Sequence, residues 1–284
     1  MKKKIGFIDY FIDEWHANNY PQMIREGAYK DKFDVALAWE EITPEGKKPL
    51  DEWCREMGVG KAASIEQIVD ECDCIVVLSP DNTERHEDLA DLPLRSGKPV
   101  YIDKPFAPSL EVAKRLFAKA EKYGAPLMSS SALRFGSGIE NALKEIGTEP
   151  VKFASVRGGG RSFHIYGIHQ IEMLVMSMGV GAKQVMQCGN GNWELMIVDY
   201  GDGRRAAVNW EYNSPFALSI SYGDKKIINV NDMPDFFPRF VDAMLGFFDT
   251  KKSVIPKEQT LEVAALVEAG IAALESHDVW VPVP

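Results

Sequence analysis

Lys104 is the residue whose type and position point most clearly to chemistry. It stands in Asp103-Lys104-Pro105, directly after the apolar segment 99–102, which is typical of a β-strand. Proline cannot donate a hydrogen bond to a sheet, and it keeps the residue before it out of the helical region. We therefore expect Lys104 to lie extended at the carboxyl edge of a parallel sheet, where α/β proteins bind their ligands. The alternative is a lysine that only extends from a strand end into solvent.

The elements that must position this lysine are predicted from the first 130 residues, in which short apolar runs alternate with segments of helical spacing. Such alternation predicts right-handed βαβ crossovers, which build a doubly wound, Rossmann-type parallel sheet. We therefore expect a Rossmann-type domain over 1–130. Its strands are expected at 4–9, 34–39, 74–78, 99–102 and 126–130, and its helices at 18–27, 50–57, 65–71, 84–96 and 110–123.

The pattern changes after about residue 134, where strand-like segments outnumber helical ones. We predict a second, α+β domain over 131–284 with a large, mainly antiparallel sheet. The turn Gly201-Asp202-Gly203 predicts a hairpin. The last helix is expected in this domain, with packing back onto the first domain as the alternative. The strands are expected at 151–157, 184–188, 193–200, 204–212, 216–222 and 226–230, and the helices at 166–178 and 259–276.

Composition excludes several classes of function. The 284 residues carry a net charge of -10, which argues against binding nucleic acid. No run approaches the roughly 20 apolar residues of a membrane span, and acidic residues soon interrupt the apolar start, so we expect neither a membrane segment nor export. The four cysteines lack the spacing of a disulfide framework or metal site, so we expect reduced thiols, no metal and a cytoplasmic protein.

Four motifs, in order, resemble those of the glucose–fructose oxidoreductase/inositol dehydrogenase (Gfo/Idh/MocA) family. Ser79-Pro80-Asp81-Asn82-Thr83 is similar to its Thr-Pro-Asn turn, and Asp103-Lys104-Pro105 to its lysine motif. Tyr166-Gly167-Ile168-His169-Gln170-Ile171-Glu172 resembles its Gly-Ile-His-x-x-Asp helix start, and the closing helix followed by 279–282 its C-terminal return. Each motif alone is weak, but four in the family order over about 200 residues make a specific match.

The resemblance implies hydride transfer from a secondary alcohol, commonly of a sugar or cyclitol, to nicotinamide. A base must take the hydroxyl proton as the hydride leaves, and His169 is the candidate. Lys104 would hold the same oxygen and stabilise its developing negative charge. Alternatively, His169 is a helix residue satisfied by Glu172 one turn later. The expected substrate contacts are Arg134, His164, Tyr166 and Glu172, with bracing of the turn as the alternative for Arg134 and core packing for Tyr166.

The cofactor expected from the resemblance is NAD, with NADP less favoured. Glu40 follows the second strand, where an acid can receive a ribose 2′-hydroxyl and repel a 2′-phosphate; a solvated loop glutamate is the alternative. The implied cofactor contacts are Ile8, Glu40, Ser79, Pro80, Asp81, Asp103 and Lys104.

The first βα turn departs from the family pattern. The family places Gly-x-Gly-x-x-Gly after its first strand, and the corresponding residues here are Asp9, Phe11 and Glu14. Phe11 would obstruct a pyrophosphate, and each carboxylate would repel it by about 1–4 kcal/mol at about 4 Å. Either the cofactor sits differently or the pocket holds something else. The loop 13–16, Asp13-Glu14-Trp15-His16, could close over a small polar ligand or a cation. Alternatively, these residues only cap the following helix and pack against their neighbours.

A second departure lies before His169, where the family commonly has an acid four residues earlier and this chain has Ile165. Without a partner that fixes its tautomer, a histidine is a weaker base. Glu172 or His164 could substitute.

Three functions follow from these observations. The leading hypothesis is an NAD-dependent oxidoreductase for a small, sugar-like polyol, with Lys104 and His169 as the catalytic pair. Its rival is a catalytically silent binding or regulatory protein on the same scaffold, and a third is a cofactor-free lyase or isomerase. One face of the open sheet in the second domain would be left exposed in a monomer. In the family this face is covered by a second subunit, so we expect a homodimer or homotetramer.

Overall fold

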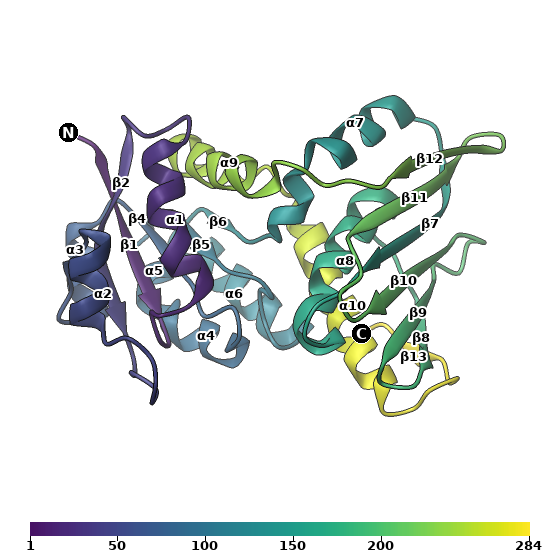
Figure 1. Ribbon diagram of the computed structural model, residues 1–284, viewed down its shortest axis with the longest axis horizontal. Coiled ribbons are helices and arrows are strands. Elements are labelled where there is room, and N and C mark those ends of the chain that lie inside the picture. Colours follow the sequence, from purple (N-terminus) through teal and green to yellow (C-terminus); the bar gives the residue numbers. More distant parts are fainter. The chain divides into compact units, whose positions relative to one another are not determined.

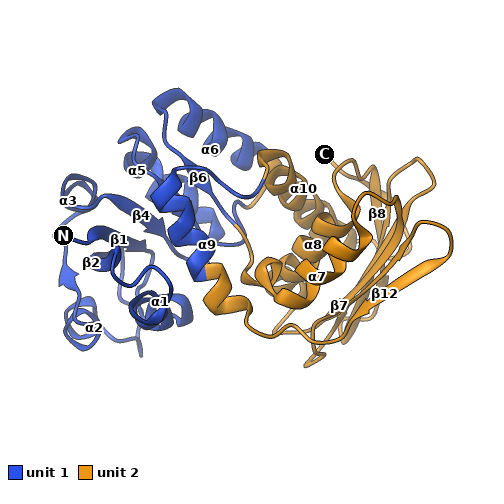
Figure 2. Cartoon of the chain, turned by 90° about the horizontal axis from the view of Figure 1, so that it is seen from above, with its two compact units in different colours: residues 1–107, 111–129, 241–255 blue, residues 108–110, 130–240, 256–284 orange.

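The computed structural model describes residues 1–284, and the chain divides into two compact units. The first unit contains residues 1–107, 111–129 and 241–255, and the second contains 108–110, 130–240 and 256–284 (Figure 2). Each unit has its own sheet. None of the helices combines the length and apolar character that a membrane span requires.

The first unit is built on a six-stranded parallel sheet in the order β3-β2-β1-β4-β5-β6. Strand order reverses between β1 and β4, so the ends of these strands flank the place where doubly wound sheets bind ligands. Its strands are β1 (Lys3–Asp9), β2 (Phe33–Glu40), β3 (Gly60–Lys61), β4 (Cys74–Val77), β5 (Val100–Ile102) and β6 (Leu127–Met128).

Helices lie on both faces of this sheet, with α1 and α2 on one face and α3, α5 and α6 on the other (Figure 2). Gly6 in β1 lets α3 approach closely, because a Cβ atom there would lie 2.3 Å from Ile68 Cγ2. The helices are α1 (Trp15–Glu26), α2 (Leu50–Met57), α3 (Ile65–Glu71), η1 (Thr83–Arg85), α4 (His86–Leu89), α5 (Asp91–Arg95) and α6 (Leu110–Tyr123).

The second unit holds a seven-stranded sheet in the order β12-β11-β7-β10-β9-β8-β13. All neighbours are antiparallel except β7 and β10, which run parallel. Its strands are β7 (Val151–Gly158), β8 (Gln184–Gly189), β9 (Trp193–Asp199), β10 (Arg205–Glu211), β11 (Ala217–Tyr222), β12 (Lys226–Val230) and β13 (Val281–Pro282).

One face of this sheet is covered by α8 (Phe163–Met178) and α10 (Lys257–Leu274) (Figure 1). The strands alternate accordingly: Met196 and Val198 are buried in the core, while Leu195 and Ile197 on the other face are partly exposed. The remaining elements are η2 (Ala132–Phe135), α7 (Ser137–Ile146) and α9 (Phe236–Thr250). The first unit takes up α9 from residue 241 onward, together with the segment up to residue 255.

The predicted fold class is confirmed: a doubly wound parallel sheet is followed by a large, mainly antiparallel one. The predicted helix 84–96 is wrong as one element, because it is broken into η1, α4 and α5. Pro93 has no N–H to bond the carbonyl of Leu89, which interrupts the helix there. Helix α1 starts three residues earlier than expected, and α7 and α9 were not predicted.

The predicted boundary after residue 130 lies beside the observed change of unit at 129/130, but 131–284 is not one continuous unit. Residues 241–255 return to the first unit, where Phe248 packs on Phe33 and Asp242 accepts a hydrogen bond from Ala28 N–H. The last helix, α10, is grouped with the second unit.

Candidate functional site

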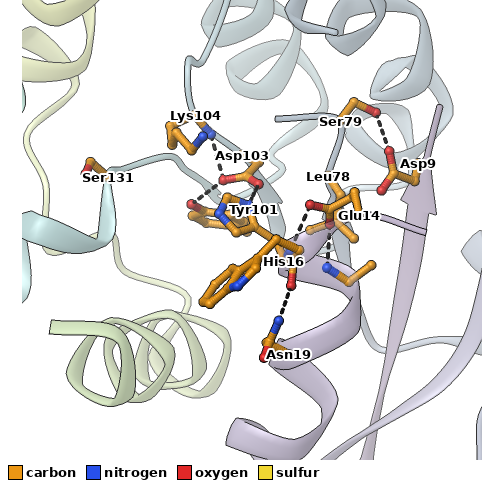
Figure 3. Close-up of polar contacts among 12 residues, drawn as sticks. Asp9, Glu14, His16, Asn19, Leu78, Ser79, Tyr101, Asp103, Lys104 and Ser131 are labelled. Atoms are coloured by element: carbon orange, nitrogen blue, oxygen red, sulfur yellow. Dashed lines mark hydrogen bonds and ion pairs between the residues drawn. The ribbon is translucent and has the colours of Figure 1, made fainter. Parts of the chain in front are cut away.

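Three strands of the first unit deliver polar residues to the switch point of the sheet (Figure 3). Asp9 ends β1, Ser79 follows β4, and Asp103 follows β5. The Ser79 hydroxyl donates to Asp9 Oδ1 at 2.8 Å and accepts from Tyr10 N–H at 2.9 Å. Ser79 has a positive φ of 69°, so the turn after β4 is held in an uncommon backbone conformation by these bonds.

Asp103 organises the centre of this cluster. One carboxylate oxygen contacts Nδ1 of His16, and the other accepts from Lys104 N–H at 2.8 Å and from the Tyr101 hydroxyl at 3.4 Å. Burial alone would raise the pKa of Asp103, but His16 and Lys104 outweigh burial and hold that pKa below its usual value. The His16 ring stacks on Tyr20, with ring centroids 5.0 Å apart and planes within 7°.

Glu14 caps the N-terminus of α1. Its carboxylate accepts hydrogen bonds from the backbone N–H groups of His16 and Ala17. Burial raises the pKa of Glu14 to about 7, with His16 opposing and Asp103 adding to the rise. Burial likewise raises the pKa of Asp9, reinforced by Glu14, and Asp9 Oδ2 has no hydrogen-bond partner.

Lys104 lies where the sequence placed it, in the turn after β5, and only 8% of its surface is exposed. A fully buried histidine, His86, braces this turn against the one after β4. Its ring nitrogens lie 2.7 Å from the carbonyl oxygen of Leu78 and 3.1 Å from that of Phe106. This histidine was not singled out from the sequence, because only the fold brings the two turns together.

The other residues expected to contact a cofactor have varied surroundings. Ile8 is fully buried in β1, Pro80 is buried, and Asp81 is exposed. Glu40 is bonded to the β1–α1 loop and to the start of α2. Its carboxylate accepts hydrogen bonds from Ile12 N–H at 2.9 Å and from Leu50 N–H at 3.1 Å.

In the second unit, His169 lies on α8, and its Nδ1 is 2.7 Å from the Ser131 hydroxyl. Its ring also lies near two aromatic rings, with centroids 5.5 Å from Tyr166 and 5.9 Å from Phe216. Ser131 was not predicted as a site residue, although it lies in the Ser129–Ser131 run that follows β6.

Glu172 was considered as the acid that orients His169, but it serves Arg134 instead. Arg134 Nε donates to Glu172 Oε2 at 2.8 Å, and Arg134 Nη1 donates to Gln259 at 2.7 Å. Arg134 also lines a pocket of about 350 Å³ in the second unit, beside Arg239. His164, the other substitute considered, is exposed.

The structure therefore brings together Ser79, Asp103 and Lys104 in the first unit, and Arg134 with Glu172 in the second. The main addition is His16, the partner of Asp103. The segment 13–16 had been expected at the ligand edge, but the pairing of His16 with Asp103 joins residues 87 positions apart and needs the fold. No group of three or more His, Cys, Asp or Glu side chains is arranged to hold a metal ion.

A doubly wound parallel sheet with polar residues and an Asp-Lys-Pro turn at its switch point defines the class of Rossmann-type folds. Residues 18–131 match the sequence model of the oxidoreductase family with an NAD-binding Rossmann fold, Gfo/Idh/MocA. The matched residues contain the motifs at 79–83 and 103–105, where the resemblance found in the sequence is confirmed.

Similar proteins agree with this assignment. Two curated relatives are uncharacterized oxidoreductases, one from Streptococcus pneumoniae (25% identical over 190 residues, 57% of this chain and 50% of the relative) and YhhX from Escherichia coli (31% over 84 residues, 30% of this chain and 24% of the relative). The chain thus spans half or less of the length of these relatives.

Solved structures share the fold over nearly the whole chain. A probable dehydrogenase from Thermotoga maritima is 14% identical with a TM-score of 0.80, covering 99% of this chain and 98% of its own. GenD2 from gentamicin A biosynthesis, solved with NAD, is 12% identical with a TM-score of 0.82, covering 100% and 97%. Scyllo-inositol dehydrogenase from Lactobacillus casei, solved with NAD(H) and scyllo-inositol, is 14% identical with a TM-score of 0.78, covering 100% and 99%.

The residues after β1 do not fit the dinucleotide that this family implies, at least in the glycine-loop mode. That mode needs backbone N–H groups at the start of α1 to face a pyrophosphate. Here the Glu14 carboxylate already accepts from two of them. A second buried carboxyl group, that of Asp9, lies at the same sheet edge.

Proposed function

We propose that this chain binds a small, hydroxyl-rich molecule of the sugar or cyclitol class and carries out acid–base chemistry on one of its hydroxyl groups. The observation that carries the proposal is the Asp103 carboxylate, which contacts the His16 imidazole and the backbone of Lys104 at the switch point. An imidazole oriented by a carboxylate and a neighbouring ammonium form a base and an alkoxide-stabilising cation.

In this proposal each residue has a defined task. Asp103 holds the proton of His16 on Nδ1, so proton exchange with a substrate hydroxyl takes place at Nε2. Lys104 binds the substrate oxygen and favours its negative charge. His169, whose Nδ1 lies 2.7 Å from the Ser131 hydroxyl in the second unit, stays a predicted base.

A second candidate is an NAD-dependent oxidoreductase that transfers a hydride between nicotinamide and a secondary alcohol of a sugar or cyclitol. It is favoured by the family match over residues 18–131 and by the order of the motifs that contain Lys104 and His169. Nicotinamide would supply the hydride acceptor, with NAD preferred to NADP. Because the loop after β1 does not fit the pyrophosphate, no step through the cofactor is derived.

Calorimetric titration with scyllo-inositol, myo-inositol and D-glucose tests the leading proposal. At least one of these polyols should bind the wild-type protein, and Lys104→Ala should weaken that binding at least tenfold with an unchanged circular dichroism spectrum. Lys114→Ala, at an exposed position on α6, is the matched control and should bind as the wild type does. Equal affinity in Lys104→Ala, or binding of none of the three polyols, would contradict the proposal.

The oxidoreductase candidate is tested with the same polyols and NAD or NADP, by following nicotinamide absorbance. Turnover that disappears in Lys104→Ala would favour it. If neither dinucleotide binds at millimolar concentration, this candidate is excluded.

We also propose a cytoplasmic location. All four cysteines are free thiols, three of them buried, which suits a reducing compartment.

A further inference from the structure

We infer that the first unit satisfies its own dinucleotide-binding groups and so does not bind NAD or NADP at the switch point: the Glu14 carboxylate occupies backbone donors that a phosphate would use, and internal donors occupy the Glu40 carboxylate that would receive a ribose hydroxyl. This inference goes beyond the proposed function, because it holds whichever polyol the protein binds. It rests on where the backbone hydrogen bonds of the β1–α1 loop go.

The backbone donors of this loop are already used inside the protein. Tyr10 N–H donates to the Ser79 hydroxyl at 2.9 Å and Ile12 N–H to Glu40 Oε2 at 2.9 Å. At the start of α1, His16 N–H donates to Glu14 at 2.7 Å, and Ala17 N–H donates to the same carboxylate. In a glycine-rich loop these are the groups that face a pyrophosphate. A phosphate would therefore have to displace a bonded carboxylate.

Glu14 is well suited to this internal role. It is 8% exposed, and its carboxylate sits at the positive end of a 12-residue helix. The Glu14 carboxyl group supplies acceptor oxygens where a phosphate would place its own. Because it is part of the chain, it competes with any free phosphate without losing translational freedom.

At Glu40 it is the ribose hydroxyl that donors of the chain itself replace. In a dinucleotide site, an acid after the second strand accepts the ribose 2′-hydroxyl. Here one Glu40 oxygen accepts from Ile12 N–H, and the other accepts from Leu50 N–H and the Thr43 hydroxyl. The side chain thus ties the β1–α1 loop to the segment that leads into α2.

Further contacts hold the loop in this state. Asp13 accepts from Lys48 N–H at 3.0 Å and from the Asn18 side chain at 2.9 Å, and Lys47 Nζ donates to the Asp13 carbonyl at 2.8 Å. The Lys47 ammonium also lies 5.0 Å from the centre of the Phe11 ring. Opening the loop for a pyrophosphate would break these bonds together.

The boundary of the family match agrees with this specialisation. The match begins at residue 18, inside α1 and after the capping glutamate, and runs to residue 131. The β1–α1 loop, whose backbone donors are internally satisfied, therefore lies outside the matched range.

Calorimetric titration with NAD, NADP, ADP and inorganic pyrophosphate tests the inference. We expect no saturable binding to the wild type at millimolar concentration. The triple variant Asp9→Gly/Phe11→Gly/Glu14→Gly, which restores the glycines, should bind NAD with an affinity at least tenfold above the detection limit that applies to the wild type. The single variant Glu14→Ala provides the same test with less disturbance of the fold, and Glu45→Ala, which removes an exposed carboxylate, is the control for charge and should still bind nothing.

Saturable binding of NAD or NADP by the wild type would overturn the inference. So would a folded Glu14→Ala variant and a folded triple variant that both still fail to bind, because the carboxylate would then not be the obstacle. If the variants unfold, backbone NMR of the wild type decides: the amide signals of His16 and Ala17 should stay unchanged on addition of inorganic pyrophosphate, and a saturable shift would refute the inference. Polyol binding is measured in a separate titration. If no polyol binds, the proposed function fails, but the results with dinucleotides and pyrophosphate still test this inference.

Discussion

At the scale of single residues, the first unit keeps two carboxyl groups, Asp9 and Glu14, buried at one sheet edge. Burial raises the pKa of both, in the case of Glu14 from 4.5 to about 7. Such groups favour the protonated form in the folded protein, and this has a measurable consequence for stability.

We predict that the free energy of unfolding falls as the pH rises from about 4.5 to about 7, because the folded state binds more protons than the unfolded chain in this range. For Glu14 alone the fall is about 2–3 kcal/mol. Urea denaturation at about pH 5 and about pH 8 should show a smaller fall in Glu14→Gln than in the wild type. An equal fall in both proteins would show that Glu14 is not the titrating group, and Glu45→Gln should behave as the wild type does.

The buried ion pair of the second unit supports another prediction. Arg134→Ala leaves the Glu172 carboxylate buried without its partner, so it should cost about 3–5 kcal/mol of unfolding free energy. Lys226→Ala, which breaks an exposed surface pair with Glu149, should leave the unfolding free energy nearly unchanged. Guanidinium denaturation of the three proteins measures both losses. Similar small losses would mean that Glu172 finds other partners.

Sequence reasoning located Lys104 and Asp103, because proline and strand patterning restrict the backbone locally. It did not find the contact of His16 with Asp103 or that of His169 with Ser131, because each pair comes from distant segments. It offered Glu172 as one alternative partner of His169, whereas in the structure the Glu172 carboxylate is paired with Arg134. Several partners are within reach of one carboxylate, and only the fold decides among them.

At the scale of elements, close packing of α3 on β1 depends on Gly6. An alanine Cβ there would lie 2.3 Å from Ile68 Cγ2, so Gly6→Ala should cost about 1–3 kcal/mol. Shortening the facing side chain should relieve the clash. In a double-mutant cycle, Gly6→Ala/Ile68→Ala should therefore cost less than the two single changes added together. Strict additivity in thermal or chemical denaturation would contradict this packing.

Element boundaries show where local signals suffice. Helices α2, α3 and α6 have the predicted bounds, because their apolar spacing and flanking turn residues agree. Helix α1 starts at Trp15 because Glu14 caps it, whereas the sequence predicted a start at residue 18. Helices α7 and α9 lacked comparably clear signals, and the return of residues 241–255 to the first unit is a tertiary event.

At the scale of the whole molecule, the outer face of the second sheet carries partly exposed apolar side chains on neighbouring strands. Ile197 on β9 is paired in register with Met186 on β8 and Ala207 on β10. Such a face favours association with another copy of the chain. We predict a homodimer or homotetramer of the 31.7 kDa chain in sedimentation velocity.

A charge in the middle of this face should weaken the assembly. Ile197→Lys is expected to shift the sedimentation profile toward the monomer while the circular dichroism spectrum stays unchanged. Lys152→Glu, at an exposed position on β7, is the control. A wild-type protein that is monomeric at micromolar concentration would contradict the prediction.

The central claim is that the chain fills its own phosphate site, and a crystal of the wild-type protein soaked in millimolar NAD tests it most directly. The account predicts that the Glu14 carboxylate remains bonded to the backbone N–H groups of His16 and Ala17, with no pyrophosphate density at the start of α1. Pyrophosphate density on those N–H groups, with the Glu14 side chain turned away, would contradict it.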